Sequence, residues 1–180
     1  MRSSDRPLIV DANVLIDYLD TEPSVLALVA RETGPLFVAM EVLAKVDQLD
    51  VTVCEELGLT IAVPSISQLL EAAVRRPGLA FDDVVCLIMA RDNGWCCVTN
   101  DRALRAACRL SGVSVQWGLE IMLRLVAKSA LSSRDAIEVA LAIQRTNRAF
   151  ITDAIVNRFK IKAARAAETS SRRKEGEGAH

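Results

Sequence analysis

Short apolar runs alternate with amphipathic segments along the first two thirds of the chain. The runs are four or five residues long and are bounded by turn-forming residues, as is typical of buried strands; they cover residues 7–10, 35–38, 60–63, 95–99 and 113–117. The segments between them carry apolar residues at three- and four-residue intervals, which predicts helices. Strands that alternate with helices across short joins favour a parallel sheet covered on both faces. We therefore predict an α/β fold, with a three-layer α/β/α domain over residues 1–125.

Capping signals place the helices between these strands. Ser, Asp and Pro favour helix starts, whereas Gly favours the residue just after a helix. The predicted helices cover residues 12–20, 21–34, 40–49, 65–76, 82–93 and 101–111.

The last third of the chain has a different pattern. No strand is predicted beyond Gly118, and residues 126–167 are predicted to form a C-terminal helical extension. Ile151, Ile155 and Phe159 share one helix face, which must pack on the domain or on a second subunit. Residues 168–180 have the composition of a disordered tail.

Histidine and cysteine usage excludes several chemistries. The only histidine is the last residue, His180. Catalysis by a Ser-His-Asp or Cys-His set and ordinary His-ligated zinc sites therefore have no residue to use in the fold. The five cysteines lie mostly in apolar runs without a CxxC pair, which indicates reduced, buried thiols.

Charge and hydropathy indicate a cytoplasmic protein without a membrane span. The longest run free of Asp, Glu, Lys and Arg is Leu57 to Leu70, shorter than the roughly 20 apolar residues that a span needs. The N-terminus lacks the apolar region of a secretory signal. The net charge is −1, but residues 158–180 carry seven basic residues and three glutamates, so the body before them is acidic.

Three aspartates stand at helix starts next to predicted strands. Asp11 and Asp101 each follow an apolar run, and Asp83 opens the helix predicted over residues 82–93. Taken singly, each is best explained as a helix cap. Because parallel strands end side by side, Asp11 and Asp101 are expected at one edge of the sheet, where α/β sheets bind ligands. Such carboxylates repel one another unless a cation joins them, and Mg²⁺ or Mn²⁺ prefers oxygen ligands.

The segments DANVLIDYL, LAFDDVVCLIMAR and VTNDRAL resemble the PIN-domain ribonucleases, the family that includes the VapC toxins of toxin–antitoxin pairs. The resemblance covers roughly residues 7–125. It implies metal-dependent hydrolysis of RNA, single-stranded or structured, with Asp11, Asp83 and Asp101 as catalytic metal ligands and Thr99 beside them. It further implies a homodimer and, for a toxin-like member, an antitoxin protein as partner.

The sequence departs from the family pattern at one position. Lys45 stands where the family has an acidic residue, while Glu41 lies one turn earlier and is a tentative replacement. Asp82 could substitute for or supplement its neighbouring aspartate. Asn13 and Asn100 could orient waters or ligands, or could simply form turns. A catalytically degenerate PIN-fold module that binds RNA or protein is therefore the alternative to a ribonuclease.

Overall fold

Five parallel strands form the single sheet in the computed structural model, which describes residues 6–74 and 77–177. Their order across the sheet is β3-β2-β1-β4-β5, and their bounds are Leu8–Val10 (β1), Leu36–Ala39 (β2), Thr60–Ala62 (β3), Cys96–Val98 (β4) and Ser114–Gln116 (β5). All five predicted strands are confirmed. The neighbouring strands β1 and β4 run in register from Leu8 opposite Cys96 to Val10 opposite Val98.

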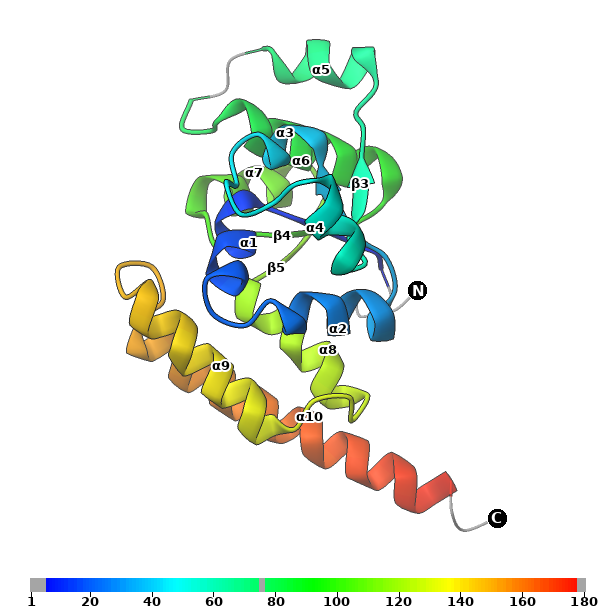
Figure 1. The fold of residues 1–180 in the computed structure, drawn as a ribbon, viewed down its shortest axis with the longest axis vertical. Coiled ribbons are helices and arrows are strands. Elements are labelled where there is room, and N and C mark those ends of the chain that lie inside the picture. Colours follow the sequence, from blue (N-terminus) through cyan, green and yellow to red (C-terminus); the bar gives the residue numbers. More distant parts are fainter. Residues whose placement is uncertain (1–5, 75–76, 178–180) are drawn as a thin grey trace.

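Helices cover both faces of this sheet, as predicted (Figure 1). Their bounds are Ala12–Leu19 (α1), Ser24–Thr33 (α2), Met40–Leu43 (α3), Val51–Glu56 (α4), Ile66–Ala72 (α5), Phe81–Asn93 (α6), Arg102–Leu110 (α7), Ile121–Ala127 (α8), Ser133–Thr146 (α9) and Asp153–Glu177 (α10), with a 3₁₀ turn at Gly118–Glu120 (η2). Helices α6 and α7 pack together on one side, whereas α2 and α8 pack together on the other.

The core lies around the two central strands. Every residue of β1 and β4 is buried, and so is every α6 residue from Val84 to Ala90. Aliphatic, alanine and cysteine side chains fill this space, and all five cysteines are free thiols inside it. The prediction of reduced, buried cysteines is therefore confirmed.

The C-terminal extension packs on the rest of the chain. Helix α10 contacts α8 and α9, and α9 in turn reaches α1 (Figure 1). The predicted apolar face is covered within the chain, because Ile151 and Phe159 are buried and Ile155 packs against the core. This covered face therefore gives no support for a second subunit.

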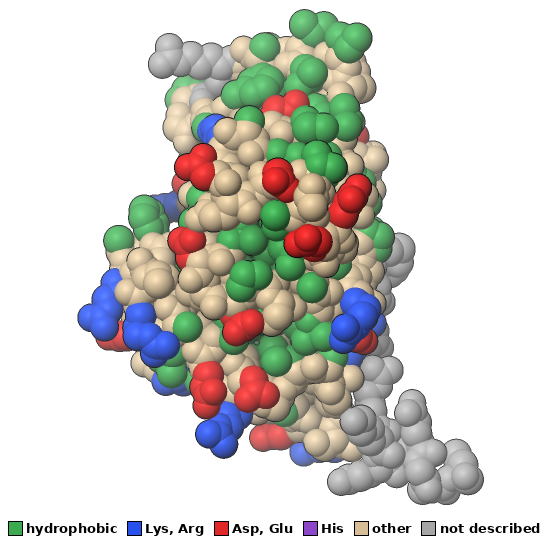
Figure 2. Space-filling view, in the orientation of Figure 1, with side chains coloured by type: hydrophobic (Ala, Val, Ile, Leu, Met, Phe, Trp, Pro, Cys, Tyr) green, Lys and Arg blue, Asp and Glu red, His purple; other side chains and the backbone are tan. Residues whose placement is uncertain are grey.

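Apolar side chains are exposed over α5 instead (Figure 2), where Ile66 and Leu70 are solvent-exposed.

Several helix boundaries differ from the prediction, most of all those of α3 and α10; α2 begins at Ser24 rather than at residue 21, and α5 ends at Ala72 rather than at residue 76. Helix α3 ends at Leu43 rather than at residue 49, and an unpredicted helix, α4, begins after Asp50, whose Oδ1 accepts the Val53 N–H at 2.8 Å. Helix α10 continues to Glu177, so the predicted disordered tail is helical from 168 to 177; residues 178–180 lie outside the described residues. Ser170 is buried there and its hydroxyl lies 2.7 Å from that of Ser129, so tertiary packing extends the helix.

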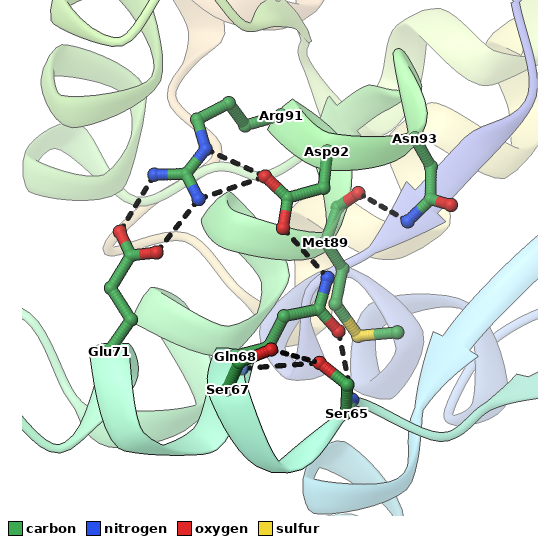
Figure 3. Close-up of polar contacts among 8 residues, drawn as sticks. All are labelled: Ser65, Ser67, Gln68, Glu71, Met89, Arg91, Asp92 and Asn93. Carbon is green, nitrogen blue, oxygen red and sulfur yellow. Dashed lines mark hydrogen bonds and ion pairs between the residues drawn. The ribbon is translucent and has the colours of Figure 1, made fainter.

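A polar network joins α5 to the C-terminal end of α6 (Figure 3). Gln68 donates to Asp92 at 2.9 Å, and both terminal nitrogens of Arg91 donate to the Glu71 carboxylate at 2.7 and 2.8 Å. Arg91 also lowers the pKa of the Asp92 carboxyl. This network is solvent-exposed and lies at the opposite end of α6 from Asp82, so it positions α5 rather than the aspartates.

No helix among the described residues is long and apolar enough to cross a bilayer.

Gly118 gives a first prediction, because a side chain has no room there. A Cβ atom would lie 3.0 Å from both Asn100 Nδ2 and Val14 Cγ2. The Gly118 N–H donates to Asn100 Oδ1 at 3.0 Å and its carbonyl accepts from the Tyr18 hydroxyl at 3.0 Å. We expect Gly118→Ala to lower the free energy of unfolding by about 1–3 kcal/mol, the usual cost of overpacking. Urea denaturation would measure it, and an unchanged midpoint with an unchanged slope would contradict the prediction.

Candidate metal centre

The candidate site lies where the order of strands reverses. The chain adds β2 and β3 on one side of β1, then crosses to place β4 and β5 on the other. Ligands of α/β sheets bind at the carboxyl ends of the strands at this switch point. Asp11 directly follows β1 and Thr99 directly follows β4. Thr99 Oγ1 donates to Asp11 Oδ2 at 2.9 Å, so the two strand ends meet through their side chains.

Three carboxylates converge at this point. Asp11, Asp82 and Asp83 each offer an oxygen, and these atoms lie within 4.8 Å of one another. Asp82 and Asp83 belong to the first turn of α6, whose N-terminus therefore faces the end of β1. Asp11 and Asp82 are buried, whereas Asp83 is half-buried. The prediction grouped Asp11 with Asp83 and Asp101; the structure groups Asp11 with both aspartates of α6.

Burial and mutual repulsion make this cluster costly in the ionised state. Burial is the main cause that raises the pKa of Asp11 to about 7; the charges of Asp83 and Asp82 contribute in the same direction, and the hydrogen bond from Thr99 opposes it. Burial likewise raises the pKa of Asp83, helped by Asp82 and Asp101 and opposed by Lys45 and the Ala80 N–H. A divalent cation would relieve this repulsion.

Lys45 already supplies one positive charge to the cluster. Its ammonium forms an ion pair with Asp82 Oδ1, and the Asp82 side chain is nearly inaccessible to solvent. Lys45 follows the end of α3, so it does not share a helical face with Glu41 as predicted. Glu41 lies outside the group of converging carboxylates, and its Oε2 is buried without a hydrogen-bond partner among the described residues. The tentative role of Glu41 as a replacement ligand gains no support from this geometry.

Asp101 serves mainly as a helix cap. Its Oδ1 accepts the Leu104 N–H at 2.6 Å, and its own N–H donates to Thr99 Oγ1 at 3.0 Å. Thr99 therefore links Asp101 to Asp11 through one hydroxyl. Asp101 is outside the close group of three, although its charge still raises the pKa of Asp83. It therefore lies at the border of the site.

Arg105 is a positioning residue that the sequence prediction missed. Its guanidinium is buried, donates to the Thr99 carbonyl at 3.1 Å and lies 3.6 Å from the centre of the Trp117 ring. Burial lowers the pKa of Arg105. This contact fixes the end of β4 and with it the threonine that orients Asp11.

Two asparagines turn out to have different environments. Asn100 bridges two segments, since its Nδ2 donates to Asp17 Oδ2 at 3.3 Å and its Oδ1 accepts from Gly118. Asn13 is exposed and its side chain makes no hydrogen bond to any described residue.

Asn147 of the C-terminal extension donates to Asp17 Oδ1 at 2.7 Å. Neither Asp17 nor Asn147 was predicted, because their pairing spans 130 residues and leaves no local signal.

The sequence matches no family model and no curated protein. The metal that the site could bind is therefore inferred from the chemistry of its residues. The donor set is all-oxygen and anionic, which fits Mg²⁺ or Mn²⁺ and does not fit a thiolate or imidazole metal. Asp11, Asp82 and Asp83 are the residues that could hold such an ion.

The raised pKa of Asp11 predicts a pH-dependent penalty in the metal-free protein. Well below pH 4 this carboxyl is protonated in both the folded and the unfolded chain, so it costs no stability. As the pH rises toward 7, the unfolded chain loses the proton first and stability falls. Asp11→Asn removes this loss. The free energy of unfolding of Asp11→Asn relative to wild type should therefore be greater at pH 8 than at pH 5 by roughly 2–3 kcal/mol.

Urea denaturation in EDTA at both pH values would measure this difference. Asp135→Asn, which neutralises an exposed carboxylate in the first turn of α9, is the matched control. Parallel pH profiles for wild type and Asp11→Asn would contradict the predicted burial penalty.

Proposed function

We propose that the chain is a Mg²⁺- or Mn²⁺-dependent ribonuclease of the PIN-domain type. The observation that carries the proposal is the convergence of Asp11, Asp82 and Asp83 at the switch point of a parallel sheet. A buried acidic group of this kind is costly to keep without a cation, and functional sites are where such costs are retained. The resemblance of the three aspartate-bearing segments to PIN domains supports RNA as substrate.

The residues of the site suit hydrolysis of a phosphodiester. When bound, the metal would activate a water molecule and neutralise charge on the phosphate. Thr99 holds the Asp11 carboxylate in one orientation, and Arg105 holds Thr99. Lys45, half-exposed beside Asp82, offers a cation toward the same charge. None of these steps needs a histidine.

The proposed partners rest on the resemblance, whereas the proposed location rests on the sequence pattern. A homodimer and an antitoxin protein follow from what PIN-domain toxins share, and a cytoplasmic location is the expectation from charge and hydropathy. The genomic neighbour of the coding sequence would test for an antitoxin, and light scattering would test for the dimer.

Cleavage assays test the proposed activity directly. With Mn²⁺, the wild-type chain should cleave single-stranded RNA, and EDTA should abolish the reaction. Asp11→Asn and Asp83→Asn should each lower kcat by more than about 100-fold, because even residues that only orient metal ligands contribute 10- to 100-fold. Asp135→Asn should keep the wild-type rate. Equal rates for wild type, Asp11→Asn and Asp83→Asn would refute the proposal.

One observation favours the alternative of a degenerate binding module. The Lys45 ammonium occupies one side of the acidic cluster through its ion pair with Asp82. A built-in cation compensates part of the charge that would otherwise attract a metal ion. If that compensation is complete, the fold would bind RNA or protein without cleaving it.

Variants that remove the Lys45 charge distinguish the ribonuclease from the degenerate binding module. Lys45→Met should tighten Mn²⁺ binding by about fivefold, since a half-exposed charge that water screens contributes on the order of 1 kcal/mol. Isothermal titration calorimetry would measure it, with Lys160→Met on α10 as the control for loss of a lysine elsewhere. Absence of Mn²⁺ binding by wild type, together with activity gained by Lys45→Glu, would establish the degenerate module instead.

A further inference from the structure

A cavity lies beside the acidic cluster, and none of the three clustered aspartates lines it. Its volume is about 280 Å³, near the lower end of the range for small-molecule sites. It is lined by Asn13, Ile16, Asp17, Asn100, Asp101, Arg102, Asn147 and Phe150. The lining comes from helix α1, from the segment that joins β4 to the start of α7, and from the turn between α9 and α10.

The inner wall of this cavity is rigid and already hydrogen-bonded. Both carboxylate oxygens of Asp17 accept from amides, one from Asn147 at 2.7 Å and the other from Asn100 at 3.3 Å. Asp17 is therefore engaged and is not open to ligate a metal. Instead, it fixes the C-terminal extension against the edge of the sheet.

The rim, by contrast, carries groups without partners. Phe150 is 69% exposed, although it lies between two anchored residues, Asn147 and the buried Ile151. The side chains of Asn13 and Arg102 are exposed and make no hydrogen bond or ion pair within the described part of the chain. An exposed aromatic ring, a free amide and a free guanidinium thus border one small cavity.

We propose that this cavity binds one unstacked nucleobase of the RNA, next to the phosphate held at the acidic cluster. Phe150 would stack on the base, Asn13 would hydrogen-bond to its edge, and Arg102 would contact the adjoining phosphate. Stacking on aromatic side chains with amide contacts to the base edge is how single-stranded nucleotides are recognised. This inference rests on the proposed ribonuclease function, and it makes the C-terminal extension part of the substrate site.

The position of the cavity fits this assignment. Asp101 lines it, and one hydroxyl, that of Thr99, links the Asp101 N–H to the Asp11 carboxylate. Cluster and cavity are therefore neighbours along the same sheet edge, as a phosphate and its own base must be. A base paired in a duplex could not enter, so the cavity selects unpaired nucleotides.

Binding measurements test the cavity without requiring cleavage. In an Asp11→Asn background with Mg²⁺, fluorescence anisotropy would report the Kd of a labelled eight-nucleotide single-stranded RNA. Phe150→Leu should weaken binding by about 10-fold, within the range measured for loss of one stacked base. Phe150→Trp should retain binding. Ile161→Ala, which truncates an exposed apolar residue of α10, should bind as the parent does.

The nucleic acid supplies the second arm of the test. A ribose-phosphate oligomer of the same length without bases should bind weakly and equally to the parent and to Phe150→Leu. An equal effect of Phe150→Leu on both oligomers would overturn the proposal, because Phe150 would then act through the fold or the phosphates. An unchanged Kd for the base-bearing RNA would overturn it as well. Since cleavage is not the readout, loss of the ribonuclease proposal would be seen separately, in the Mn²⁺ assays.

Discussion

The burial of Asp11 at the meeting point of β1 and β4 is the constraint on which the site depends. Its carboxylate is 1% exposed and two further carboxylates approach it, so its ionised form is unfavourable in the protein alone. Thr99 offsets part of that cost with one hydrogen bond. Neutral donors such as this hydroxyl and the Ala12 N–H do not match the desolvation of the carboxylate, so the arrangement is balanced only with a proton or a cation. Which of the two is present sets the charge that the site shows to a phosphate.

The sheet and most helix ends could be predicted from the sequence, because each depends on local chemistry. Ser65, Asp101 and Ser132 cap their helices as capping preferences predict, and Gly94 ends α6 in the left-handed conformation. The choice of carboxylates could not be predicted in the same way. Asp82 and Asp83 are consecutive on a helix, and only the packing of α6 in the folded chain brings both carboxylates near Asp11.

The remaining differences come from contacts between distant segments. The periodicity of residues 40–49 suits a helix, yet the chain turns after Leu43 and Lys45 reaches Asp82 across 37 residues. The polar composition after residue 167 suits disorder, yet Ser170 packs against Ser129. Both features depend on partners that no local window contains. The asparagine that joins the C-terminal extension to Asp17 belongs to the same class.

The link between Asn147 and Asp17 bears on the proposed binding of RNA by a body that is acidic. The phosphates of RNA are repelled by uncompensated carboxylates, and long-range attraction by basic surface would need charge that this body lacks. Contacts that do not depend on net charge then gain importance. The Phe150 ring and the Asn13 amide would supply such contacts. The ring lies near the carboxylates because Asp17 holds Asn147 of the extension, whereas Asn13 belongs to α1. Affinity from the base and catalysis from the cation would thus come from adjacent parts of one edge, each supplying what the other lacks.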